Sequence, residues 1–144
     1  MTNLSHHTLR SYDKQLQRLL SLILDMGKEV RELVIAAKQS FRARDEGRVA
    51  DAKHADKHIN ELDLQIEEEA TVVLALQNPM AIDLRFVIAI IKITGMLEHA
   101  GDLAKNTVKR SVRMGDFAPE AAIVKLELMA DIIVEMLDGA LTAF

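Results

Sequence analysis

The stretch KITGMLEHAGDLAKNTVKRSVR, residues 92–113, decides the fold of this chain. Its apolar spacing predicts the second half of a long helix. Glu98 and Asp102 are four residues apart, which places them one turn apart on the same helix face. The residues that precede them on that face, Val87 and Ile91, are apolar. Because a solvated face is usually polar along its whole length, this change from apolar residues to carboxylates predicts a site.

Apolar residues at helical spacing predict four long helices. The helices are expected over residues 7–43, 46–76, 79–114 and 119–144. Gln77-Asn78-Pro79 should form the turn between the second and third helices, because proline disfavours helical conformation in the residue before it. Residues 115–119 should form the next break. The first half of the third helix, 84–91, is apolar nearly all round, so we expect it to be the most buried part.

An internal repeat appears when the chain is compared with itself. Residues 26–41 align with residues 129–144 and share four identities. The identical pairs are Met26 with Met129, Glu32 with Glu135, Ala37 with Ala140, and Phe41 with Phe144. The expected fold is therefore all-α, an antiparallel three-helix bundle of long helices plus a fourth helix that begins a second repeat. The expected domains are a three-helix unit at 1–115 and the first helix of an incomplete second unit at 116–144. A lone helix must pack on the others or on another subunit.

Composition narrows the class of protein. The chain has 144 residues, of which 49% are hydrophobic, so it can bury a single-domain core. The net charge of −4 argues against general nucleic-acid binding. The chain has no cysteine, which excludes disulfides and thiolate metal sites. The N-terminus lacks a signal-peptide pattern, and the longest apolar run is too short for a bilayer. We therefore expect a soluble cytoplasmic protein without direct membrane insertion.

The predicted hairpin brings oxygen ligands together. Counted from the turn, Asp56 lies level with Asp102, and Asn60 lies level with Glu98. Four oxygen donors that converge in two such pairs, one helical turn apart, suit a cation such as Mg²⁺, Mn²⁺, Fe or Zn²⁺. The metal-site hypothesis therefore assigns Glu98, Asp102, Asp56 and Asn60 as ligands, with the identity of the metal left open.

Other assignments of these charged residues remain open. In the main alternative a lysine pairs with the acids across the groove. The candidate lysines are Lys53, Lys57, Lys105 and Lys109. Asp63 and Glu67 lie opposite apolar residues, so we expect them to be exposed. His54 and His58 have a spacing that can bind zinc, but they face away from the carboxylates, which favours ordinary surface histidines.

The chain lacks the patterns typical of enzymes. No serine or threonine has an obvious base beside it, and no glycine-rich loop suits a phosphate group. A di-iron bundle oxidase would need Glu-x-x-His on two helices, whereas this chain has only Asp51-x-x-His54. We expect a non-enzymatic protein. A metalloenzyme that uses the same carboxylates, and a purely structural or interaction bundle, are the two alternatives.

Three segments resemble the PhoU family of phosphate-uptake regulators. LEHAGDLAKN at 97–106 is similar to the family signature, which usually reads Leu-Glu-Arg-Ile-Gly-Asp; here His99 and Ala100 replace Arg and Ile. QNPMAIDLR at 77–85 is similar to the family's turn, and DKHIN at 56–60 resembles its acidic motif in the second helix. The combination is specific, although each segment alone is modest.

The resemblance implies two tandem three-helix units and metal binding through Glu98, Asp102, Asp56 and Asn60. It also implies a cytoplasmic adaptor that connects the ATPase of the phosphate ABC transporter with a sensor histidine kinase. Such an adaptor would restrain uptake and hold the kinase off when phosphate is plentiful. We also expect a homo-oligomer.

Overall fold

The computed structural model contains four long helices in the part of the chain that it describes, residues 3–43, 45–77, 79–114 and 119–143. The helices are α1 (Asn3–Ala43), α2 (Gly47–Gln77), α3 (Ile82–Met114) and α4 (Glu120–Thr142). These bounds lie within a few residues of the expected ones. Asn78 of the expected turn and most of the break at 115–119 fall outside the described residues.

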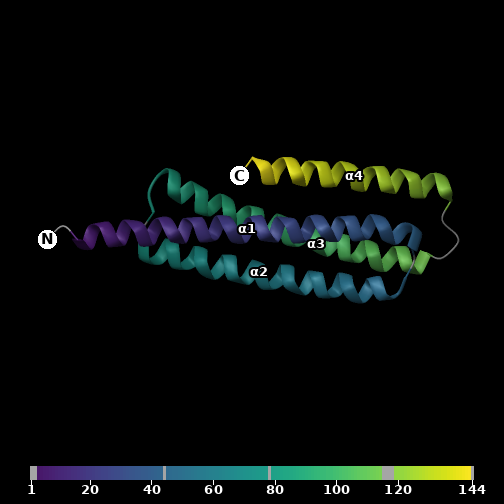
Figure 1. The fold of residues 1–144 in the computed structure, drawn as a ribbon, viewed down its shortest axis with the longest axis horizontal. Helices are drawn as coiled ribbons and strands as arrows, with labels where there is room; N and C mark the ends of the chain where they lie inside the picture. The colour runs from purple at the N-terminus through teal and green to yellow at the C-terminus, as the bar shows by residue number, and fades with distance from the viewer. Residues whose placement is uncertain (1–2, 44, 78, 115–118, 144) are drawn as a thin grey trace.

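The first three helices form one bundle. Within the described residues, α1, α2 and α3 pack pairwise, whereas α4 packs against α1 alone. Successive helices run in opposite directions, and α4 lies on the other side of α1 from α2 (Figure 1). The prediction of an all-α antiparallel bundle with a fourth helix is confirmed. The division into domains at 115–116 stays a prediction.

The bundle core is formed by one stripe of large side chains on each helix. Leu19 and Met26 of α1, Ile59 and Ile66 of α2, and Ile90 of α3 are fully buried. Removing each such side chain from water contributes about 1.5–3 kcal/mol. This burial holds the three helices in a fixed register.

Two contacts, one between serine hydroxyls and one at a glycine, define how α3 approaches its neighbours. The hydroxyl oxygens of Ser40 and Ser111 lie 2.5 Å apart in the core and connect α1 to α3. A Cβ atom at Gly101 would lie 3.0 Å from Cδ1 of Ile59 and 3.7 Å from Cγ2 of Val30. Because Gly101 lacks that atom, α3 can approach both α1 and α2 closely next to the predicted site.

The prediction that residues 84–91 are the most buried part is wrong. Val87 and Ile90 are buried, but Ile88 is 40% exposed and Ile91 is 37% exposed. α1 and α2 cover only one face of this segment. Among the described residues α4 packs against α1 alone, with Leu141 at Gly27, so it does not cover the other face. A continuous apolar run therefore does not indicate neighbours on every side.

α4 is attached to α1 mainly along one edge. Ile123 and Ala130 are buried. Three ion-pair groups, which we call the α1–α4 ladder, run beside them. They join Arg31 to Asp138, Lys38 to Asp131, and Arg42 to Glu127 and Glu120. The guanidinium of Arg42 donates to both carboxylate oxygens of Glu127, at 2.6 and 2.8 Å.

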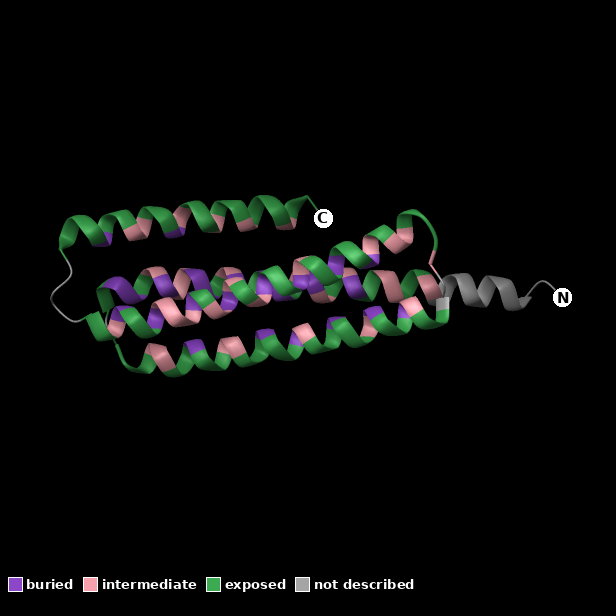
Figure 2. Cartoon of the chain, turned by 180° about the vertical axis from the view of Figure 1, so that it is seen from behind, coloured by how far each residue is buried: buried purple, intermediate pink, exposed green. Residues whose placement is uncertain are grey.

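The rest of α4 is largely open to solvent, as the exposure colouring indicates (Figure 2). Six large apolar side chains, between 43% and 69% exposed, form what we call the α4 apolar face. They are Val124, Leu128, Met129, Ile132, Ile133 and Met136. The fourth helix was expected to pack on the other helices or on another subunit. In the structure α4 packs on α1, and only one of its sides does so.

Candidate functional site

The predicted hairpin register brings Asp56 of α2 and Asp102 of α3 to a single ammonium group. Nζ of Lys105 donates to Oδ2 of Asp56 at 2.8 Å and lies 2.6 Å from Oδ1 of Asp102. The side chains of Asp56 and Lys105 are only 13% and 23% exposed, so water screens this contact weakly. We call these three residues the Lys105 bridge. Of the four candidate lysines, Lys105 is the one that pairs across the groove.

The pKa values of Asp102 and Lys105 are shifted in the directions that favour the charged form of each group. The hydrogen bond from Lys105 lowers the pKa of Asp102 from its ordinary value, against the opposing effect of burial. Hydrogen bonds to Asp102 and Asp56 raise the pKa of Lys105. Nδ2 of Asn106 also donates to Oδ2 of Asp102, at 2.9 Å. Both oxygens of Asp102 therefore have partners on α3.

Glu98 and Asn60 occupy different surroundings. Glu98 is half-buried and Asn60 is exposed.

Burial first, and then the negative charges of Glu67 and Glu98, raise the pKa of Asp63. Asp63 is half-buried, which corrects the prediction that it is exposed, whereas the prediction is confirmed for Glu67. The sequence analysis therefore missed Asp63 as a neighbour of Glu98, because residue counting from the turn sets it slightly out of level.

The four predicted ligands do not fit a divalent cation in their present arrangement. The ammonium of Lys105 lies between Asp56 and Asp102, where a bridging cation would lie. Among the described residues, histidine and acidic side chains form no group of three or more that could hold a metal ion. Metal binding by Glu98, Asp102, Asp56 and Asn60 stays a prediction, and the position of Lys105 is a physical argument against it.

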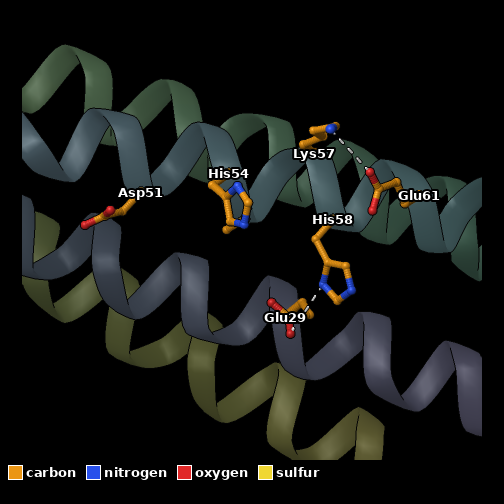
Figure 3. Close-up of a pocket in the computed structure, with 7 residues that line it drawn as sticks. Glu29, Asp51, His54, Lys57, His58 and Glu61 are labelled. Carbon is orange, nitrogen blue, oxygen red and sulfur yellow. Dashed lines mark ion pairs between the residues drawn. The ribbon is translucent and has the colours of Figure 1, made fainter.

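A second group of titratable side chains lines a hollow of about 510 Å³ between α1 and α2. His54 and His58 project from α2 toward α1, and Glu29 of α1 points toward His58 (Figure 3). Nδ1 of His58 lies 3.6 Å from Oε1 of Glu29, an attraction that requires a protonated imidazole. Both histidines are exposed and project toward α1, as expected from their helix face, which points away from the carboxylates.

An apolar groove of about 240 Å³ lies between α3 and α4. Val34, Ala37 and Phe41 of α1 line it, with Leu103 of α3 and Ile133 of α4. The sequence analysis missed this groove, because periodicity gives each helix an apolar face without saying which faces stay apart. The groove continues into the α4 apolar face, and together they form a sizeable apolar surface that is open to water.

Fold and site together define a class: a long-helix bundle whose second and third helices carry a carboxylate pair around an internal lysine. No helix among the described residues has both the length and the apolar character needed to cross a membrane. The model of the PhoU domain matches residues 23–111, which include about half of α1, all of α2 and most of α3. The chain belongs to the PhoU family.

Curated relatives agree with this assignment along nearly the whole chain. A Caulobacter vibrioides protein, named phosphate-specific transport system accessory protein PhoU homolog, is 34% identical over 143 residues, which are 98% of this chain and 62% of the relative. A Zymomonas mobilis protein of the same name is 30% identical over 96% of this chain and 58% of its own length. An Edwardsiella tarda protein, named phosphate-specific transport system accessory protein PhoU, is 28% identical over 99% and 58%. The chain thus spans about three fifths of these relatives.

Proposed function

We propose that this chain is a non-enzymatic regulator of phosphate uptake and phosphate-starvation signalling. In this proposal it acts in the cytoplasm as an adaptor between the ATPase of the phosphate ABC transporter and a sensor histidine kinase. It restrains uptake and starvation signalling when phosphate is plentiful. The observation that carries the proposal is the PhoU-domain match over 23–111, supported by relatives whose names place them with the phosphate-specific transport system.

The surface of the molecule supports a role in protein contacts. Monomeric proteins rarely expose large contiguous apolar patches, and such patches often mark interaction sites. The α4 apolar face has six large side chains that are at least 43% exposed. We propose that two copies of the chain associate through this face. In the same proposal, α4 is the first helix of a second three-helix unit, whose remaining helices would cover the face in a longer relative.

The regulatory role can be tested in a bacterial strain that lacks its own PhoU protein. The strain would express this chain, and phosphate uptake and a starvation-gene reporter would be measured in phosphate-rich medium. We expect the reporter to fall toward the level of the parent strain. Copurification of the transporter ATPase and the sensor kinase with the chain would test the adaptor role directly. An unchanged reporter, despite folded and well-expressed protein, would count against the regulatory function.

A matched pair of variants separates the α4 apolar face from the rest of the surface. Leu128→Glu places a charge within that face, and Leu64→Glu places one on exposed α2; the two leucines are 58% and 60% exposed. We expect Leu128→Glu to weaken self-association, while Leu64→Glu leaves it unchanged. Equal effects of both variants would mean that the α4 apolar face has no special role.

A further inference from the structure

We propose that the ammonium of Lys105 acts as a built-in counter-cation for Asp56 and Asp102. The chain then joins α2 to α3 at the PhoU signature without a divalent metal, and a cation site appears only when the Lys105 charge is removed. This inference rests on the geometry of the Lys105 bridge and is independent of the proposed regulatory function. It also opposes the prediction that these carboxylates bind a metal.

The first argument is the position of the ammonium. Two carboxylates from adjacent helices contact Nζ of Lys105, at 2.8 and 2.6 Å. A cation that bridged the two helices would have to take the same position. An arriving Mg²⁺ or Mn²⁺ would meet the positive charge of Lys105 at close range, beside an Asp56 side chain that is only 13% exposed. Binding would therefore require displacement of the lysine side chain.

The second argument is that the lysine is held in place. Lys105 follows Asp102 by three residues on α3, so helix geometry sets it beside that carboxylate. Its side chain is 23% exposed, unlike that of Lys57 at 75%, which pairs only with Glu61 of its own helix. A partly buried lysine between two acids has little freedom to leave, because Asp56 would lose this counter-charge and Asp102 would keep only the hydrogen bond from Asn106.

The third argument is the set of oxygen donors that would remain for a metal. One oxygen of Asp102 already accepts from Asn106, and Asn60 offers a neutral, exposed amide. Mg²⁺ and Mn²⁺ favour octahedral sites built from about six oxygen donors, with carboxylates among them. Water can supply most of these six donors, but Asp56 and Asp102 cannot offer their facing oxygens to a metal while the Lys105 ammonium contacts them.

Mn²⁺ titration followed by electron paramagnetic resonance tests the proposal. Mn²⁺ suits the test because it prefers oxygen ligands and would avoid the exposed histidines of α2. The proteins compared are the wild type, Lys105→Met, Lys105→Met/Asp102→Asn, and the control Lys109→Met, one turn further along α3. We expect no stoichiometric Mn²⁺ binding by the wild type or the control. Lys105→Met should bind at least about tenfold more tightly, and the double variant should lose that gain.

Thermal melting provides a second measurement on the same proteins. Lys105→Met should melt below the wild type, because two facing carboxylates lose their counter-charge. Added Mn²⁺ should restore most of the lost melting temperature in Lys105→Met. The melting temperature of the wild type should change neither with Mn²⁺ nor with a chelator.

Two results would overturn the proposal. One is wild-type protein that binds Mn²⁺ stoichiometrically and loses it in Asp56→Asn/Asp102→Asn. The other is Lys105→Met protein that melts at the wild-type temperature, or that neither binds Mn²⁺ nor is stabilised by it. The Mn²⁺ titration of the wild type does not depend on Lys105→Met, so it still tests the proposal if that variant fails to fold.

Discussion

α1 and α4 share a sequence pattern but differ in how they are buried. In the aligned repeat, Val30 of α1 is 0% exposed, whereas its counterpart in α4, Ile133, is 44% exposed. Met26 is 0% exposed, whereas Met129 is 57% exposed. The α2–α3 hairpin covers the core face of α1, whereas among the described residues α4 packs against α1 alone. Burial in this chain is therefore set by the available neighbours rather than by the helix itself.

The largest expected effect comes from placing the same charge at aligned positions. Val30→Asp would bury a carboxylate without a partner, and we expect it to remove about 4 kcal/mol or more of unfolding free energy. Ile133→Asp leaves the carboxylate in contact with water, so we expect a loss below about 1 kcal/mol. Urea denaturation of both variants checks the difference. Equal losses at the two positions would mean that α4 is as buried as α1.

The second effect concerns self-association, which is expected of the exposed α4 apolar face and not of the buried stripe of α1. A double variant, Leu128→Glu with Ile132→Glu, should convert the proposed oligomer to monomer while changing the urea midpoint little. Light scattering across a protein dilution series measures the mass. A wild type that stays monomeric at every concentration would contradict this prediction.

The third effect is a pH dependence of the α1–α4 ladder. Hydrogen bonds from Arg42 hold the pKa of Glu127 below its ordinary value of 4.5. A lowered folded-state pKa contributes stability that is present above pH 4.5 and lost as pH falls through the folded value. Below about pH 4.5, the protection factors of amides in α4, which are corrected for the intrinsic exchange rate at each pH, should therefore fall more than those in α1. In Arg42→Gln this additional loss of protection should be absent; its persistence would assign the effect to other groups.

The smallest expected effect on stability comes from the turn that connects α2 to α3. Ala81 has a φ of 49°, a left-handed conformation that favours glycine. Ala81→Gly should relieve this strain and stabilise the bundle by up to about 1 kcal/mol. The control Ala75→Gly, within α2, should destabilise by about 1 kcal/mol instead. Thermal unfolding distinguishes the two signs, and a loss of stability at both positions would contradict the strain at Ala81.

Local sequence patterns predicted much of this architecture. Helical periodicity and the proline turn gave the helix bounds, and counting from that turn placed Asp56 beside Asp102. The same counting named Lys105 among four candidate partners but could not choose it, because side-chain direction depends on packing. The exposure of Ile88 and Ile91 was equally beyond periodicity, since it depends on which helices pack against each face of α3. Local rules therefore fixed the elements, while long-range packing determined their surroundings.

Native-state hydrogen exchange of the two aligned helices tests the central claim most directly. In dilute protein, amides at 26–40 of α1 should exchange only through global unfolding, because the bundle core covers them. Amides at 124–136 of α4 should exchange through local opening and therefore much faster. Equal protection of both segments would contradict the account, because α4 would then be a full member of the core.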